Sequence, residues 1–95
     1  MHVFDALGNP VRRAILHELR AGPRSVGEIA AELPVSRPAV SRHLRVLEDA
    51  GLVEAREDGA RNLYSVRMLG FASVREFVDA FWDSALARLE ELARR

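Results

Sequence analysis

Residues 36–53, SRPAVSRHLRVLEDAGLV, constrain the fold of this 95-residue chain more than any other stretch. Ser36 is a preferred helix N-cap, and Pro38 is tolerated in the first helical turn, where no backbone donor is needed. Gly51 is a typical residue just past the C-terminal end of a helix. Together these signals predict a helix that is capped by Ser36 and runs to about Ala50.

The two sides of this predicted helix differ in chemistry. At the helical period, Val40, Leu44 and Leu47 form the centre of an apolar side. That side is widened by three flanking residues, Ala39, Val46 and Ala50. The opposite side is polar, with Arg37 near the border, and consists of Pro38, Ser41, Arg42, Arg45 and Asp49. We therefore expect one face to be buried and the other to stay open.

Arg37, Ser41 and Arg45 follow one another at four-residue spacing and form a single ridge on the open side. An α-helix fits the major groove of DNA, where arginine can donate two hydrogen bonds to guanine. Small residues near the helix start, including Ser36 and Ala39, allow close approach to the DNA. The ridge predicts a recognition helix; the ordinary alternative is a solvated charged face.

The formal net charge of the chain is zero, which argues against a protein that is basic overall. The charge of the contacting face matters more for nucleic-acid binding than the net charge does. Between Ser36 and Leu47 there are three arginines and no acid, whereas five acids face four arginines after Met68. The positive charge is therefore local to the middle of the chain.

Earlier signals predict three helices ahead of the recognition helix. A short helix over residues 2–7 comes first. Asn9 and Pro10 are a good N-cap and a good first residue for the second helix. Ser25 and Glu28 match a capping box and open a third, short helix.

After residue 51 the pattern changes to strands. The segments LVEAR, residues 52–56, and NLYSV, residues 62–66, flank EDGAR, whose Asp58–Gly59 step is a strong hairpin turn signal. One hairpin alone is marginal in water, so it must lean on the helices. A helix, a turn, a second helix and then a hairpin are typical of a winged helix-turn-helix.

A last helix is predicted to begin near Ala72 or Ser73. Its apolar face is broad and comprises Val74, Phe77, Val78, Phe81, Trp82, Ala85, Leu89 and Leu92. A face this wide exceeds what one small domain covers, and such a patch marks an interaction surface. We expect a dimer interface; the alternative is that Phe77, Phe81 and Trp82 line a small-molecule pocket. Two-fold pairing would also place two recognition helices about 34 Å apart, one DNA turn.

The predicted fold class is mainly α with a β-hairpin wing: a winged helix-turn-helix of order α-α-α-α-β-β-α. It forms a single DNA-binding domain over residues 1–95. Within it, residues 1–8 and 70–95 are the dimerisation helices, residues 25–51 the helix-turn-helix and residues 52–66 the wing.

Three stretches of the chain resemble the ArsR/SmtB family of winged-helix transcriptional regulators. They are FDALGNPVRRAILHEL, SVGEIAAELPVSRPAVSRHLRVLEDAGLV and AREDGARNLYSV. The resemblance covers almost the whole chain and implies a bacterial or archaeal homodimeric repressor that binds a palindromic operator in double-stranded DNA. It also implies that the first and last helices build the dimer and that the fourth helix enters the major groove.

The metal sites of that family do not match this chain. Pro34 and Ser36 stand where the metal sensors have a Cys-x-Cys pair, and the chain has no cysteine. Asp79 is followed two positions later by Phe81 rather than histidine, and no histidine occurs in the last helix. The chain is therefore similar to the non-metal-sensing branch, and we expect no metal and no cofactor. The sequence identifies no small-molecule effector.

Two other function classes are excluded by pattern. No pair of histidine, serine or carboxylate side chains stands at a spacing that would activate a nucleophile, so we predict no catalytic residue and no enzyme. No apolar run approaches the roughly 20 residues of a membrane span, and the first residues do not resemble a secretion signal. We therefore expect a cytoplasmic protein with no membrane partner.

The residues predicted to contact DNA are Ser25, Ser36, Arg37, Pro38, Ala39, Ser41, Arg42, His43, Arg45, Arg56, Arg61 and Asn62. The predicted dimer interface comprises Val3, Phe4, Val74, Phe77, Val78, Phe81, Trp82 and Leu89. Each of two residues in the first list also has a possible structural role. Ser25 can act as a helix N-cap, and His43 can pack on the flank of the buried side. Arg12 and Arg13 are expected at the edge of the dimer or of the DNA surface. The rival function is a winged-helix protein-interaction module that does not bind DNA.

Overall fold

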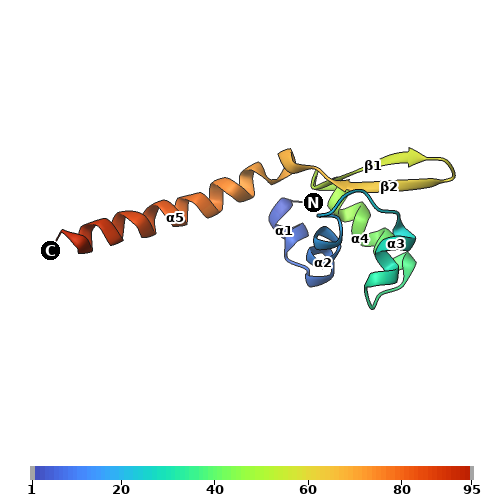
Figure 1. Ribbon diagram of the computed structural model, residues 1–95, viewed down its shortest axis with the longest axis horizontal. Coiled ribbons are helices and arrows are strands. Elements are labelled where there is room, and N and C mark those ends of the chain that lie inside the picture. The colour runs from blue at the N-terminus through green and yellow to red at the C-terminus, as the bar shows by residue number, and fades with distance from the viewer. Residues whose placement is uncertain (1, 95) are drawn as a thin grey trace.

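A computed structural model describes residues 2–94, and its elements follow the predicted order (Figure 1). In chain order they are α1 (Val3–Leu7), α2 (Pro10–Glu18), α3 (Val26–Glu32), α4 (Arg37–Asp49), β1 (Val53–Asp58), β2 (Arg61–Val66), the 3-10 helix η1 (Met68–Phe71) and α5 (Ala72–Ala93). The winged helix-turn-helix arrangement is thus confirmed, with one additional 3-10 turn before α5. Met1 and Arg95, the ends of the predicted domain, lie outside the described residues.

The predicted helix caps are present. The Asn9 side chain accepts hydrogen bonds from the backbone N–H groups of Val11 and Arg12. Ser25 and Glu28 form both halves of a capping box, each side chain accepting from the backbone N–H of the other residue. Ser36 Oγ accepts from Ala39 N at 3.3 Å. These caps satisfy N–H groups that a helix start leaves without a partner, and they fix where α2, α3 and α4 begin.

The hairpin turn lies one residue later than predicted. Asp58 pairs with Arg61 in the last rung of the antiparallel ladder, so the two-residue loop is Gly59–Ala60 and not Asp58–Gly59. Gly59 has a φ of 64°, a left-handed conformation that glycine adopts without a steric penalty. Glycine at the first position of a two-residue loop suits the twist of the flanking strands, and this preference moves the turn.

The hairpin is tied to the helical body by a short bridge. Arg24 N donates to the Tyr64 carbonyl oxygen at 3.0 Å, and Tyr64 N donates to the Arg24 carbonyl oxygen at 2.8 Å. Val53, the first residue of β1, is 2% exposed. Because an isolated hairpin is marginal in water, these contacts explain how the wing holds its position.

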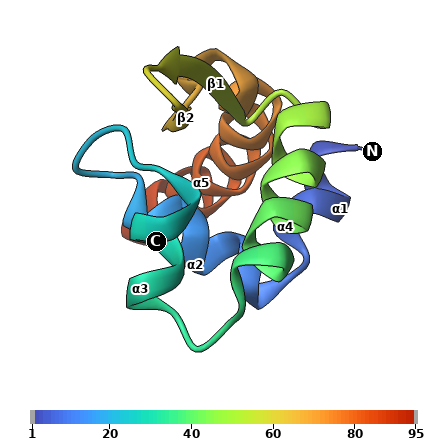
Figure 2. The same ribbon diagram turned by 90° about the vertical axis from the view of Figure 1, so that its right-hand side faces the viewer.

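The core lies among α1, α2, α3, α4 and the start of β1. Figure 2 shows these helices gathered beneath the hairpin, with α5 running away behind them. The buried apolar residues are Ala6, Ile15, Leu19, Ile29, Val40, Leu44, Leu47, Leu52 and Val53. The core therefore belongs to the winged-helix body and leaves out α5.

Helix α5 projects from this body as a long arm (Figure 1). Its 22 residues span about 33 Å, and the described chain measures 64 × 25 × 25 Å. No residue of α5 is buried. No helix within residues 2–94 is both long and apolar enough to cross a membrane.

Candidate nucleic-acid interface

The two sides of α4 are as different in the structure as in the sequence. Val40, Leu44 and Leu47 have no exposed surface. The residues on the other side are exposed, namely Arg37, Pro38, Ser41, Arg42, Arg45 and Asp49. The predicted division of the helix into a buried and an open face is confirmed. The exposed residues of α4 include three arginines and two acids, Glu48 and Asp49, which lie at its C-terminal end.

A cleft of about 530 Å³ joins the helix-turn-helix to the wing. It is lined by residues of α3 and its cap, α4 and β2: Ser25, Val26, Gly27, Arg37, Ser41, Arg61, Asn62 and Tyr64. Five of these were predicted as DNA contacts from separate parts of the sequence. Arg56 does not line this cleft; it lies instead in a shallow hollow with Pro23, Glu54, Ala55, Leu63 and Ser65.

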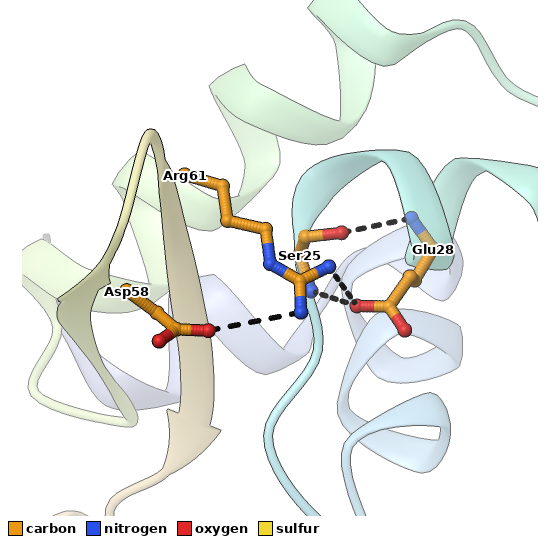
Figure 3. A network of polar contacts seen from close by, with 4 residues as sticks. All are labelled: Ser25, Glu28, Asp58 and Arg61. Atoms are coloured by element: carbon orange, nitrogen blue, oxygen red, sulfur yellow. Dashed lines mark hydrogen bonds and ion pairs between the residues drawn. The ribbon is translucent and has the colours of Figure 1, made fainter.

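Arg61, at the start of β2, is held by two carboxylates (Figure 3). Its guanidinium lies 3.4 Å from Glu28 Oε1 and 3.7 Å from Asp58 Oδ2. Glu28 Oε1 also accepts from Ser25 N at 3.0 Å. The hydrogen bonds from Ser25 hold the pKa of Glu28 below its usual value, and Arg61 and Arg24 act in the same direction. Glu28 is thus a carboxylate near neutral pH. It forms an ion pair with Arg61, which was predicted to contact DNA.

Ser25 is the one buried residue among the predicted DNA contacts. Its Oγ accepts from Glu28 N at 3.2 Å, so its capping role is confirmed. Arg56 and Asn62 are exposed on the wing.

His43 is half-buried on the flank of α4, where the helical projection places it. Arg12 Nη1 lies 3.4 Å from its Nδ1. Desolvation lowers the pKa of His43, and the positive charges of Arg12 and Arg42 lower it further. His43 is therefore mostly neutral at pH 7.

Arg12 and Arg13 have a role that the sequence did not reveal. Arg12 Nε donates to the Ala6 carbonyl oxygen at 2.7 Å, and Arg13 Nη1 donates to the Leu7 carbonyl oxygen at 2.7 Å. Both side chains therefore satisfy carbonyl groups at the C-terminal end of α1, which no longer have partners inside that helix. The only available signal was two arginines a few residues after a short helix, which is too weak to predict this contact.

A second surface lies on α5 and α1. The rings of Phe4 and Phe77 meet edge to face with centroids 5.2 Å apart, and Phe77 and Phe81 do so at 5.0 Å. Phe81 and Trp82 are each 64% exposed, and the row of exposed apolar residues continues through Leu86, Leu89 and Leu92. Val3 and Val74, also predicted for the dimer interface, are half-buried. We call this row the α5 apolar face.

Residues 2–94 contain no group of three or more histidine and acidic side chains that could hold a metal ion. The described residues thus place an arginine-bearing helix and two wing arginines on one body and an exposed apolar face on the projecting helix.

Comparison with known proteins identifies the family to which the chain belongs. Residues 7–56 match the model of a family described as a helix-turn-helix domain. The chain is 47% identical over 89 residues to the HTH-type transcriptional regulator Rv2034 of Mycobacterium tuberculosis, covering 94% of this chain and 83% of that protein.

Two solved structures are similar along most of the chain. A crystal structure described as a possible transcriptional regulator for arsenical resistance has a TM-score of 0.76 and 40% identity, covering 92% of this chain and 91% of that one. The solution structure of the homodimeric winged helix-turn-helix DNA-binding domain of Mb0332 from Mycobacterium bovis, a possible ArsR-family regulator, has a TM-score of 0.70 and 34% identity, covering 85% and 75%. The chain belongs to the ArsR/SmtB family of winged helix-turn-helix transcriptional regulators.

Proposed function

We propose that this protein is a homodimeric repressor that binds a palindromic operator in double-stranded DNA in the cytoplasm. The observation that carries the proposal is the open face of α4, where Arg37, Ser41, Arg42 and Arg45 are exposed. The centre of the opposite face, at Val40, Leu44 and Leu47, is fully buried. A helix held in this way presents its cations without moving, which suits insertion into the major groove. Arg42 and Arg45 donate to guanine edges, and Ser36, Pro38 and Ala39 allow close approach.

The wing holds the DNA backbone. Arg61 and Asn62 line the same cleft as Arg37 and Ser41. The sugar-phosphate backbone that borders the major groove would therefore contact both β2 and α4. Arg56 adds a contact from the outer side of the wing. Arg61 exchanges Glu28 and Asp58 for a phosphate when DNA binds. Ser25 serves as the cap that places α3, and His43 lies at the edge of the groove.

The α5 apolar face pairs with the same face of a second copy. Phe77, Phe81, Trp82 and Leu89 are more than half exposed, and Val78 is 43% exposed. A contiguous apolar patch of this kind is stabilised by association. The homodimeric state of the Mb0332 domain supports this pairing. A symmetric dimer presents two copies of α4 to two half-sites, and a dimer seated on an operator within a promoter blocks access to it.

The proposal is tested by fluorescence polarisation on DNA from upstream of the protein's own gene. Binding should weaken steeply as salt rises, because bound phosphates release counterions. Arg42→Ala and Arg45→Ala should each cost about 1–3 kcal/mol for a lost base contact. Arg20→Ala removes the same charge from the exposed turn that follows α2 and serves as the matched control, with a much smaller expected loss.

Two results would contradict the proposal. If both α4 variants bind as tightly as the parent, α4 does not enter the groove. If the parent does not bind this DNA or any sequence enriched from a random pool, even at low salt, the chain is a protein-interaction module.

A further inference from the structure

Arg12 joins three helices through one guanidinium group. It belongs to α2, and its Nε and Nη2 donate to the carbonyl oxygens of Ala6 and Asp5 in α1 at 2.7 and 3.2 Å. Its Nη1 lies 3.4 Å from His43 Nδ1 in α4. The planar guanidinium offers five N–H donors in a fixed geometry, so all three contacts depend on one orientation of the group.

The chemistry of the contact fixes the state of His43. Arginine only donates hydrogen bonds, so His43 Nδ1 must accept, and the proton of the neutral ring sits on Nε2. A protonated imidazole would place two cations against each other. The same ring is half-buried next to Val40 and Leu44, which are fully buried, so its position follows that of α4.

The contacts continue from Arg12 to the α5 apolar face. Phe4 packs edge to face on Phe77, so α1 touches α5 on one side and receives Arg12 on the other. Helix α4 carries the proposed base contacts one turn or less from His43, at Ser41, Arg42 and Arg45. A continuous series of contacts, which passes through the backbone of α1, thus links the proposed dimer surface to the proposed DNA surface.

We propose that Arg12 is a positioning residue that fixes the orientation of α4 relative to α1, the helix that contacts α5, and thereby sets the half-site spacing that the dimer accepts. The inference rests on the proposed function and goes beyond it, because it assigns operator geometry to a residue outside both surfaces. Adding one base pair moves a half-site by about 3.4 Å and rotates it by about 35°. A dimer with a rigid joint rejects that change, whereas a dimer with a loosened joint tolerates it.

Arg13 is a matched control within the chain. It also donates from a guanidinium to the end of α1, at the Leu7 carbonyl oxygen, and its side chain is exposed. Within the described residues this hydrogen bond reaches α1, and α4 is contacted by Arg12 instead. Arg13→Lys should therefore disturb the cap of α1 without releasing α4.

The experiment uses full-length protein and an operator selected by the parent from random DNA. Three duplexes carry the two half-sites at the selected spacing, one base pair closer and one base pair farther apart, and a fourth carries a single half-site. Arg12→Lys keeps the charge but loses the planar fork. His43→Leu keeps both Arg12 contacts to α1 but removes the acceptor, and it carries the test if Arg12→Lys does not fold.

We expect Arg12→Lys and His43→Leu each to reduce the parent's preference for the selected spacing by about threefold or more. Single half-site affinity should be almost unchanged in Arg12→Lys, and the spacing preference of His43→Leu is measured relative to its own single half-site affinity. The double variant should be no worse than Arg12→Lys alone, because that substitution already breaks the contact that His43→Leu removes. Arg13→Lys should keep the parental preference.

Three results would overturn the inference. The first is an unchanged spacing preference in both variants. The second is an equal loss on all four duplexes, which would make His43 a DNA contact or Arg12 a general stabiliser. The third is a loss in Arg13→Lys that matches the loss in Arg12→Lys. A parent that selects no DNA overturns the proposed function itself, which separates that failure from failure of the Arg12 contact alone.

Discussion

Helices α4 and α5 are both amphipathic, but only α4 has its apolar side covered. Val40, Leu44 and Leu47 of α4 have no exposed surface. In α5, by contrast, no residue is buried, and Phe77, Phe81, Trp82, Leu86, Leu89 and Leu92 are all more than half exposed. The amphipathic pattern therefore leads to a buried apolar side in α4, whereas the apolar side of α5 stays exposed to solvent in a single chain.

This difference separates two sources of stability. The orientation of α4 is fixed by the core of one chain, so the cations on its open face are presented by each subunit independently. In the proposed dimer a second copy covers the α5 apolar face, because the contact of Phe4 with Phe77 leaves most of that face exposed within residues 2–94. Folding of the winged-helix body and pairing of the arms should respond to different substitutions.

The largest expected effect comes from opening a cavity beneath α4. Leu44→Ala should lower the free energy of unfolding by about 2–5 kcal/mol, because Leu44 is fully buried and the surrounding core can collapse only partly. Chemical denaturation at one fixed protein concentration measures the loss. Leu69→Ala, at a position 80% exposed in η1, is the control and should change stability by less than about 0.5 kcal/mol. Equal losses in the two variants would mean that α4 is not set by the core.

The next effect concerns the α5 apolar face. Phe81→Ala should weaken self-association by about 2 kcal/mol, or about thirtyfold in Kd, because aromatic side chains at the centre of an interface dominate its energy. Sedimentation over a range of protein concentrations measures the constant. Asp83→Asn, on the acidic side of the same helix, should leave it nearly unchanged. An unaltered Kd in the phenylalanine variant would remove Phe81 from the interface.

The contrast between these helices also explains how far the sequence could predict the molecule. The caps at Asn9, Ser25 and Ser36 use local rules, and their positions were predictable to the residue. The turn was misplaced by one residue because Asp58–Gly59 and Gly59–Ala60 compete for the same loop, and the pairing of Asp58 with Arg61 decides between them.

The contacts that were not predictable join residues far apart in the chain. Arg12 reaches His43 across 31 positions, and Arg61 reaches Glu28 across 33. Neither contact follows a helical or strand period, so no pattern in the sequence marks it. The breadth of the α5 apolar face was predictable, because helical spacing alone places its residues on one side.

A smaller effect should follow from releasing Arg61. Glu28→Gln keeps a side chain that can cap α3. It removes the negative charge of Glu28, whose Oε1 lies 3.4 Å from Nη1 of Arg61. DNA affinity should rise by about twofold to fivefold, since an exposed ion pair of this kind contributes about 1 kcal/mol or less. Polarisation measures the gain, and Glu57→Gln, on the exposed part of β1, serves as the control. Lower affinity in the Glu28 variant would show that the ion pair orders Arg61 for binding.

The smallest effect is a pH dependence at the contact between His43 of α4 and Arg12 of α2. The pKa of His43 lies below its ordinary value of 6.5 in the folded chain, so the unfolded chain binds this proton at higher pH. The contribution of His43 to stability is thus fully present above 6.5 and is lost as pH falls toward the folded pKa.

Denaturation at about pH 7.5 and about pH 5.5 checks this dependence, since the two conditions lie on either side of the ordinary histidine pKa of 6.5 and both lie above the pKa of Glu28. The parent should lose more stability between the two conditions than His43→Leu. Identical losses would show that His43 does not couple to folding.

The central claim is that the uncovered side of α5 belongs to a pair of chains, and sedimentation equilibrium of the parent protein tests it most directly. The chain has a mass of 10.6 kDa, so a symmetric pair predicts a species of about 21 kDa at micromolar concentration. A single species of 10.6 kDa that persists as the concentration is raised would contradict the account.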